Sequence, residues 1–281
     1  MTDADINQDQ KEFWNGQGGS SWVSGQEEMD RFLAPFTEQL MVHAAPADGQ
    51  RVLDIGCGTG DTSLRAASAV GAAGAVHGVD ISQPMLELAR TRAKDARAAH
   101  ATFALGDAQT DTLGDAADLV ISRFGVMFFE QPVAAFKNIH AHTKPGGRMV
   151  FVCWQPVREN EWVHIGLGIA KKHVAFPPPP DPHAPGPFAF ADIERTLGIL
   201  GDAGWSNASA EPFAAKLNQG SSAQAAAESL MLRGPISRVM MDKTDAEKAA
   251  VMSDLTDAMT AKITDGQVML GAGVWIVSAT A

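Results

Sequence analysis

The sequence has no tyrosine and only two cysteines, Cys57 and Cys153, among its 281 residues. Two isolated cysteines exclude a disulfide framework and a multi-cysteine zinc site. The missing tyrosines exclude a hydride-transfer site built on a Tyr/Lys pair, because that site needs a phenolic hydroxyl. No stretch approaches the ~18–20 apolar residues that span a bilayer, and the polar residues 1–14 lack the pattern of a signal peptide. We therefore expect a reduced, cytoplasmic protein with no membrane partner and no metal.

Basic side chains are also few. The chain has 22 Lys and Arg against 33 Asp and Glu, which gives a formal net charge of −11. An acidic protein repels phosphate backbones, so nucleic acid is not expected as a partner. Hydrophobic residues make up 45% of the chain, a share typical of globular proteins that bury a core. The length suits one α/β domain with an insert, since such domains reach ~250 residues.

From residue 51 onward, short apolar runs alternate with amphipathic stretches. Strands are predicted at residues 51–55, 75–79, 101–105, 118–122 and 148–154, and helices at 61–70, 83–97 and 132–142. Strands separated by helices of this length imply right-handed crossovers and a parallel sheet. The predicted fold class is therefore α/β, a doubly wound and mostly parallel sheet with helices on both faces.

The remaining segments are expected to flank this core. Apolar residues at helical spacing predict a helix over 26–44, so residues 1–50 should form an N-terminal helical cover. Residues 155–190 contain the prolines 177–180 and are predicted to be a lid or insert, because long loops in compact domains are often functional. Residues 191–281 should add helices and a final strand at 273–281 to a single domain.

The strongest motif is the glycine-rich turn Asp54-Ile-Gly-Cys-Gly-Thr-Gly60, between a predicted buried strand and a predicted helix. The missing Cβ atoms let a ligand approach the backbone, and N–H groups of the turn and helix end can face it. The dinucleotide fingerprint has its third glycine where this chain has Asp61. Asp54 beside the turn suits a cationic ligand and opposes a pyrophosphate.

The turn and the motifs after it resemble those of class I S-adenosylmethionine-dependent methyltransferases. In detail they are similar to the small-molecule subgroup related to ubiquinone/menaquinone C-methyltransferases. The matching segments, in the family's order, are the turn itself, Gly78-Val-Asp-Ile-Ser82, Leu105-Gly-Asp-Ala-Gln109, residues 118–124 and Lys144-Pro-Gly-Gly-Arg-Met-Val-Phe. The resemblance covers about residues 51–154 and implies a seven-stranded, Rossmann-like sheet.

This resemblance implies S-adenosylmethionine as cofactor, with S-adenosylhomocysteine as product. Asp80 would accept hydrogen bonds from the ribose hydroxyls, and Asp107 with the N–H of Ala108 would bind adenine. Asp54, Asp80 or Asp107 taken alone would be better explained as a solvated turn acid, but the spacing of all three favours a site. The predicted cofactor-binding residues are Asp54, Gly56, Cys57, Gly58, Gly60, Asp80, Ile81, Asp107, Ala108, Ser122, Trp14 and Trp22.

Residues near the expected methyl group are harder to assign. Arg123 directly follows the fourth predicted strand and is the candidate catalytic residue, because it could pair with a substrate carboxylate. The alternative is a salt bridge to a neighbouring acid. Cys57 is interpreted as a spacer in the turn. The predicted substrate pocket consists of Trp154, Trp162, His164 and Met127.

The sequence thus predicts an enzyme that transfers a methyl group from S-adenosylmethionine to a small-molecule acceptor by in-line displacement. The protein would act mainly by positioning the reactants, as a monomer or homodimer. One alternative is a non-catalytic S-adenosylmethionine-binding protein. Another is a nicotinamide-dependent oxidoreductase, which the glycine spacing and the absence of tyrosine disfavour.

Overall fold

The structure is a computed structural model that describes residues 7–176, 178 and 181–281. It divides into two compact units. The sheet unit contains Met1–Trp154, His183–Pro212 and Val274–Ala281, and the helical unit contains Gln155–Pro182 and Phe213–Gly273. Residues 1–6 of the predicted N-terminal cover, and Pro177, Pro179 and Pro180 of the predicted lid, lie outside the described residues.

The sheet follows the strand order β3-β2-β1-β4-β5-β8-β6, and the short β7 pairs with β8 off this path. Its strands are β1 (Arg51–Ile55), β2 (Ala75–Asp80), β3 (Ala101–Leu105), β4 (Ala117–Arg123), β5 (Thr143–Trp154), β6 (Ser206–Gly220), β7 (Ile263–Thr264) and β8 (Gln267–Thr280). The first five strands pair in parallel, and β8 runs antiparallel to β5. The predicted doubly wound α/β fold is confirmed, with seven strands along the main path.

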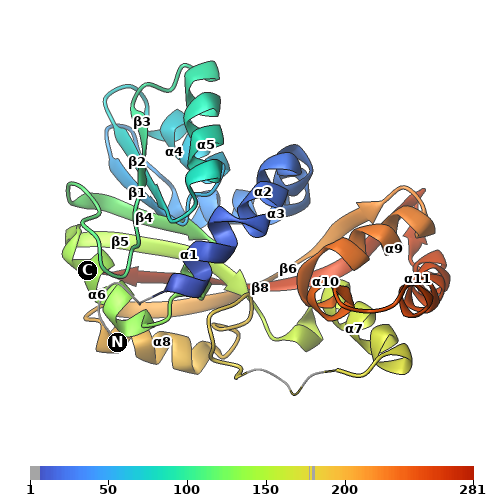
Figure 1. The fold of residues 1–281 in the computed structure, drawn as a ribbon. Helices are drawn as coiled ribbons and strands as arrows, with labels where there is room; N and C mark the ends of the chain where they lie inside the picture. The colour runs from blue at the N-terminus through green and yellow to red at the C-terminus, as the bar shows by residue number, and fades with distance from the viewer. Residues whose placement is uncertain (1–6, 177, 179–180) are drawn as a thin grey trace. The chain divides into compact units, whose positions relative to one another are not determined.

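The central strands are buried because helices cover both faces of the sheet (Figure 1). The helices α4 (Asp61–Val70) and α5 (Gln83–Asp95) connect β1 to β2 and β2 to β3. The helix α6 (Pro132–Ala141) connects β4 to β5 in the opposite direction along the sheet. Right-handed crossovers place α4 and α5 on one face and α6, with its neighbour α8 (Ile193–Asp202), on the other. The direction reverses between β1 and β4, where folds of this kind bind ligands.

The N-terminal cover consists of α1 (Gln8–Asn15), α2 (Gln17–Ser24) and α3 (Gln26–Ala44). The predicted helix over 26–44 is confirmed, and it buries Phe32, Leu33, Phe36 and Leu40 against β4, β5 and α4. The two shorter helices had no sequence signal of their own, because residues 7–25 are polar and rich in Gly and Ser. No helix among the described residues is long and apolar enough to cross a bilayer.

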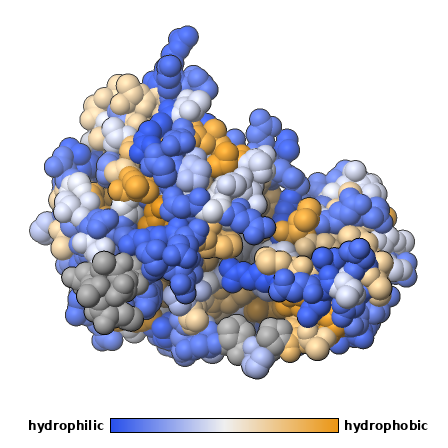
Figure 2. All heavy atoms as spheres, viewed as in Figure 1, coloured by the Kyte–Doolittle hydropathy of each residue, from blue (hydrophilic) through white to orange (hydrophobic). Residues whose placement is uncertain are grey.

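The helical unit contains the 3-10 turn η3 (Val157–Glu159) and the helices α7 (Glu161–His173), α9 (Ala223–Leu232), α10 (Gly234–Met240) and α11 (Asp245–Thr260). Within it, α7 packs on α10 and α11, and α9 packs on α11. The predicted insert 155–190 therefore begins with a 3-10 turn and the helix α7, and the structure divides it between the units after residue 182. Its action as a lid stays a prediction. In the space-filling view, hydrophilic side chains cover most of the visible face, and hydrophobic ones show in smaller areas (Figure 2).

Candidate functional site

The glycine-rich turn between β1 and α4 has a backbone that favours glycine. Gly56, Gly58 and Gly60 have positive φ angles of 64°, 54° and 86°. At Gly56 a Cβ atom would lie only 2.6 Å from the Cα of Gly125, so the turn passes directly against the segment after β4. On its other side, the N–H of Gly56 donates to the carbonyl of Val79 in β2 at 2.8 Å. Two neighbouring strands therefore fix the turn.

Cys57 occupies the turn as a spacer, as the sequence suggested. Its side chain is buried against Gly78, where an added Cβ would lie 2.8 Å from the Cys57 sulfur. Burial, followed by the charges of Asp80 and Asp54, raises the pKa of the Cys57 thiol well above its usual value. A neutral, enclosed thiol is not a nucleophile.

Asp54 lies in β1 beneath the turn and is fully buried. Its Oδ2 accepts hydrogen bonds from Thr62 Oγ1 and Ser63 Oγ, both at 2.6 Å, at the start of α4. Its Oδ1 has no hydrogen-bond partner among the described residues. Burial raises the pKa of Asp54 to about 6, although the two hydroxyl bonds and the charge of Arg123 oppose this shift. A buried carboxylate with one unpaired oxygen favours a cationic ligand at that oxygen.

Asp80 ends β2 and turns its carboxylate back toward the glycine turn. Its Oδ2 accepts the N–H of Gly58 and its Oδ1 the N–H of Ser82, each at 2.8 Å. A carboxylate can accept about four hydrogen bonds, so Asp80 keeps room for a further donor beside its backbone partners. Burial raises the pKa of Asp80, and the backbone hydrogen bonds oppose that shift.

Asp107 follows β3 and is only 2% exposed. Its Oδ1 accepts from the N–H and the Nε2 of Gln109, at 3.0 and 3.4 Å. Its Oδ2 accepts from Asn7 Nδ2 at 3.3 Å and pairs with Lys11 Nζ at 3.2 Å. Asn7 and Lys11 thus belong to the site, and sequence reasoning missed them because no motif links them to a residue about a hundred positions away. Ala108 is buried beside Asp107.

The helices α1 and α2 lie against the end of β2. Ser82 Oγ donates to the carbonyl of Trp14 at 2.6 Å, and Asn15 Nδ2 donates to the carbonyl of Ile81 at 2.8 Å. The Trp14 ring meets the Trp22 ring edge-on, with centroids 6.0 Å apart. These hydrogen bonds hold Trp14 and Asn15 against Ile81 and Ser82, the two residues that follow Asp80. Contact of Trp14, Trp22 or Ile81 with a ligand stays a prediction.

The end of β4 joins the site through Ser122 and carries Arg123. Ser122 Oγ donates to the carbonyl of Ile55 at 2.7 Å and so ties the ends of β1 and β4 together. Arg123 Nη1 donates to Asp61 Oδ2 at 2.7 Å and also to Thr37 Oγ1, and the Arg123 and Asp61 side chains are 8% and 9% exposed. The salt bridge that the sequence left as an alternative is what the structure shows. Because the guanidinium is held in this buried pair, we assign Arg123 no catalytic role.

Burial raises the pKa of Asp61, but the charges of Arg123 and Arg65 outweigh it, so the pKa lies below its usual value. Asp61 therefore stays ionised opposite Arg123. Asp61 stands where the dinucleotide fingerprint has its third glycine. Here it has a structural role, because its ion pair with Arg123 anchors the end of β4 to α4.

The four residues of the predicted substrate pocket are divided between the two units. In the sheet unit, Trp154 stacks on Phe124 at a centroid distance of 4.2 Å, and Met127 is buried in the 3-10 turn η2 (Val126–Phe128). In the helical unit, the Trp162 indole N–H donates to the buried Asn160 Oδ1 at 3.1 Å, and His164 is exposed on α7. The structure does not bring the four into one described site, so their shared role stays a prediction.

Phe124 marks strain that the sequence could not show. Its φ angle is 61°, which is unusual for a bulky side chain. The ring is held in this conformation between Trp154, on which it stacks, and Phe36, which it meets edge-on at 5.9 Å. Strained residues of this kind cluster at functional sites. The aromatic group lies where β4 and β5 end, the side of the sheet that carries the glycine turn.

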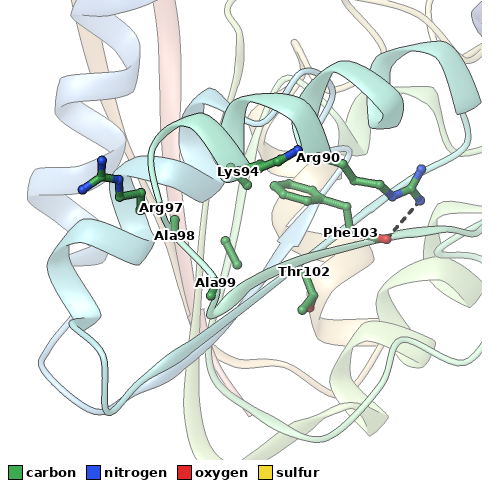
Figure 3. A pocket seen from close by; sticks show the side chains of 9 residues that line it. Arg90, Lys94, Arg97, Ala98, Ala99, Thr102 and Phe103 are labelled. Carbon is green, nitrogen blue, oxygen red and sulfur yellow. Dashed lines mark hydrogen bonds between the residues drawn. The ribbon is translucent and has the colours of Figure 1, made fainter.

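A separate pocket of about 560 Å³ lies between the second half of α5 and the beginning of β3 (Figure 3). It is lined by Arg90, Ala93, Lys94, Arg97, Ala98, Ala99, Ala101, Thr102 and Phe103. None of the predicted site residues is among them. The pocket lies toward the amino end of β3, whereas open parallel sheets bind ligands beyond the carboxyl ends. We therefore place the candidate site at the turn and not in this pocket.

Comparison with known proteins finds similarity over the part of the chain that contains the turn. Residues 52–147 match a family model described as a methyltransferase domain. Over this segment, the chain is similar to the methyltransferase domain. The segment runs from β1 into β5 and includes Asp54, Asp80 and Asp107.

Curated relatives also match part of the chain. The chain is 36% identical over 121 residues to the aklanonic acid methyltransferase DauC of Streptomyces sp. (strain C5), covering 43% of this chain and 55% of that protein. It is 33% identical over 103 residues to a demethylmenaquinone methyltransferase of Anoxybacillus flavithermus, covering 36% and 44%. The chain therefore spans about half the length of the curated relatives it matches.

Solved structures share the fold at low identity. The YcgJ protein of Bacillus subtilis has a TM-score of 0.57 and 16% identity, over 87% of this chain and 97% of its own. A Haemonchus contortus phosphoethanolamine N-methyltransferase, in complex with S-adenosyl-L-methionine, has a TM-score of 0.57 and 18% identity, over 96% and 59%. The 4+2 cyclase SpnF has a TM-score of 0.53 and 20% identity, over 88% and 79%. These likenesses establish the fold.

Proposed function

We propose that the methyltransferase domain binds S-adenosylmethionine and transfers its methyl group to a small-molecule acceptor. The observation that carries the proposal is the unpaired, buried Oδ1 of Asp54 beneath the glycine turn. An ammonium group on the ligand would satisfy this oxygen, while a pyrophosphate would be repelled by it. The site therefore suits the methionine portion of S-adenosylmethionine better than a nicotinamide dinucleotide.

The neighbouring carboxylates fit the rest of the same cofactor. Asp80 keeps acceptor capacity beside its backbone partners, which suits hydroxyl donors such as those of a ribose. Asp107 follows the next strand of the sheet and is buried, which suits the amino group of an adenine. Three acids on adjacent strands would thus contact three parts of one elongated ligand.

The chemistry divides between the cofactor and the chain. S-adenosylmethionine supplies an activated methyl group when bound. The chain binds and orients it, and such positioning can lower a barrier by ~7–11 kcal/mol. The buried ion pair of Arg123 and Asp61 fixes the end of β4 beside the turn without itself reacting. A small-molecule acceptor is supported by the relatives named for aklanonic acid and demethylmenaquinone, and the net charge of −11 opposes a nucleic-acid acceptor.

A second candidate is an S-adenosylmethionine-binding protein that does not transfer the methyl group. This second candidate is retained because SpnF, which has a similar fold, is described as a cyclase and not as a methyltransferase. The fold alone therefore does not fix the reaction.

The test is a transfer assay with S-adenosylmethionine and a panel of quinones, phenols and aromatic carboxylic acids. Mass spectrometry follows both S-adenosylhomocysteine and the gain of one CH₂ unit by an acceptor. Both products should appear together, and heat-denatured protein is the control. Binding of S-adenosylmethionine with no methylated product across the panel would support the second candidate.

A further inference from the structure

We propose that α1 competes with the cofactor's adenine for Asp107. Lys11 would leave this carboxylate when the cofactor binds, and Asn7 would stay as an additional adenine-binding residue. The inference rests on the proposed function. It adds that Asn7 and Lys11, which belong to no motif, set the affinity of the site for the cofactor.

The hydrogen-bond acceptor positions of Asp107 are all occupied in this structure. An ionised carboxylate offers about four acceptor positions. Among the described residues, Gln109 supplies two donors to Oδ1, and Asn7 and Lys11 supply one each to Oδ2. All positions are therefore taken. An adenine amino group can bind this carboxylate only if one of the present donors leaves.

Lys11 is the donor best able to leave. Its side chain is 33% exposed, so its ammonium can return to water without a burial cost. Gln109, in contrast, is two residues from Asp107, is itself buried, and its side-chain oxygen accepts the N–H of Gln131 at 2.7 Å. The N–H of Asn7 donates to Glu130 Oε2 at 2.6 Å, which anchors Asn7 beside the carboxylate.

The attachment of α1 would let the Lys11 side chain move without displacing the whole helix. The helix has eight residues and fully buries none of them, and the Trp14 ring near its far end packs on Trp22 and Phe128. Its far end is held by the hydrogen bonds of Trp14 and Asn15 to Ser82, Ile81 and Gln83. Lys11 can therefore move while the end of the helix stays attached beside Asp80.

Asn7 supplies the second step. It is only 5% exposed, yet its Oδ1 has no hydrogen-bond partner among the described residues. The Nδ2 of the same amide already contacts Asp107 Oδ2, so the unpaired oxygen lies close to the acceptor that Lys11 would release. An adenine amino group has two N–H bonds and could donate one to Asp107 and one to Asn7. The exchange would pair a polar atom that is otherwise buried alone.

The experiment is calorimetric titration of the full chain with S-adenosylhomocysteine. Lys11→Met, which keeps the aliphatic stem and removes the charge, should bind roughly three- to tenfold more tightly than the parent. Added salt should strengthen binding to the parent, because it screens the competing ion pair, and should lack this effect on Lys11→Met. Lys94→Met, at an exposed lysine of α5, is the matched control and should bind as the parent does.

Asn7→Gly tests the second step, since glycine tolerates the φ of 64° found at Asn7. The readout is the ratio of affinities for S-adenosylhomocysteine and S-inosylhomocysteine, in which a carbonyl replaces the adenine amino group. This ratio should fall in Asn7→Gly, an effect that a purely structural role would not produce.

Equal or weaker binding by Lys11→Met, with the parent binding normally, would overturn the proposed exchange. An unchanged ratio in Asn7→Gly would overturn the role of Asn7. If neither the parent nor any variant bound S-adenosylhomocysteine, the proposed function would be wrong and this inference would be wrong with it.

Discussion

Asp54 in the sheet unit and Glu161 in the helical unit differ in how many of their carboxylate oxygens have a partner. In the sheet unit, Asp54 is buried with an unpaired oxygen. In the helical unit, Glu161 is paired on both oxygens, to Lys262 Nζ at 2.9 Å and to the N–H of Gly271 at 2.8 Å. Among the described residues, the unpaired buried side-chain atoms of the helical unit are neutral, on Gln219 and Ser229, whereas those of the sheet unit include carboxylate oxygens of Asp54 and Asp30. Of these two acids, Asp54 is the one that lies beneath the glycine turn.

The largest change in a measured free energy should come from Asn160→Ala in the helical unit, which should lower stability without changing ligand affinity. Asn160 is fully buried, and its Oδ1 accepts from the Trp162 indole and from the N–H of Gly273. The substitution leaves both donors unpaired, so the free energy of unfolding should fall by ~2–4 kcal/mol. Urea unfolding measures this loss. The affinity for S-adenosylhomocysteine at low temperature should not change, and a parallel loss of affinity would contradict the contrast.

The next effect should come from Asp80→Ala in the sheet unit. This substitution removes a charge-assisted contact to the ribose, so binding of S-adenosylhomocysteine should weaken by ~1.5–3 kcal/mol. Asp115→Ala, which removes an exposed acid paired with Arg51, is the control and should bind normally. Titration calorimetry compares the two. If Asp80→Ala bound as well as the parent, the ribose assignment would be wrong.

A pH dependence should separate Asp54 from the paired acids. Its folded pKa of about 6 means that the carboxyl is largely protonated at pH 5, so binding of a cationic ligand should weaken roughly tenfold between pH 7.5 and pH 5. Because this pKa is raised above the unfolded value, the group also stabilises the unliganded fold at low pH. That stabilisation is lost as the pH rises through about 6. Asp54→Asn should bind less tightly at neutral pH and should show a flatter pH profile; an unchanged profile would show that Asp54 does not meet the ammonium.

The smallest effect should come from Glu161→Gln. The Lys262–Glu161 pair is partly exposed to solvent, so the free energy of unfolding should fall by less than about 1 kcal/mol. The hydrogen bond to Gly271, with the contacts of Lys262, lowers the pKa of Glu161, so its contribution to stability should be lost as the pH falls. Thermal melts at neutral and acidic pH measure this, and a larger loss of ligand affinity than of stability would argue against a packing role.

The core of the fold could be predicted because its signals are local. Strands such as β1 and β3 are short apolar runs bounded by turns, and α3 has a clear apolar face. β6 was missed because its alternating residues are mostly alanine and polar side chains, with Pro212 inside the strand. The helix α7 was missed because the prolines that follow it made the whole of residues 155–190 resemble a loop.

The candidate carboxylates could be found from the sequence because Asp54, Asp80 and Asp107 lie in or just after the ends of three successive strands. Asn7 and Lys11 come to Asp107 from another part of the chain, and only tertiary packing reveals the contact. Arg123 shows the opposite case, because its position in the sequence suggested chemistry while its contacts with Asp61 and Thr37 show a structural role.

The most direct measurement is a calorimetric titration of the purified chain with S-adenosylhomocysteine, with NAD titrated in parallel. The account predicts one-to-one binding of S-adenosylhomocysteine and none of NAD, because the unpaired carboxylate beneath the turn favours an ammonium and repels a pyrophosphate. Binding of NAD without binding of S-adenosylhomocysteine would contradict the assignment of the turn and of all three carboxylates.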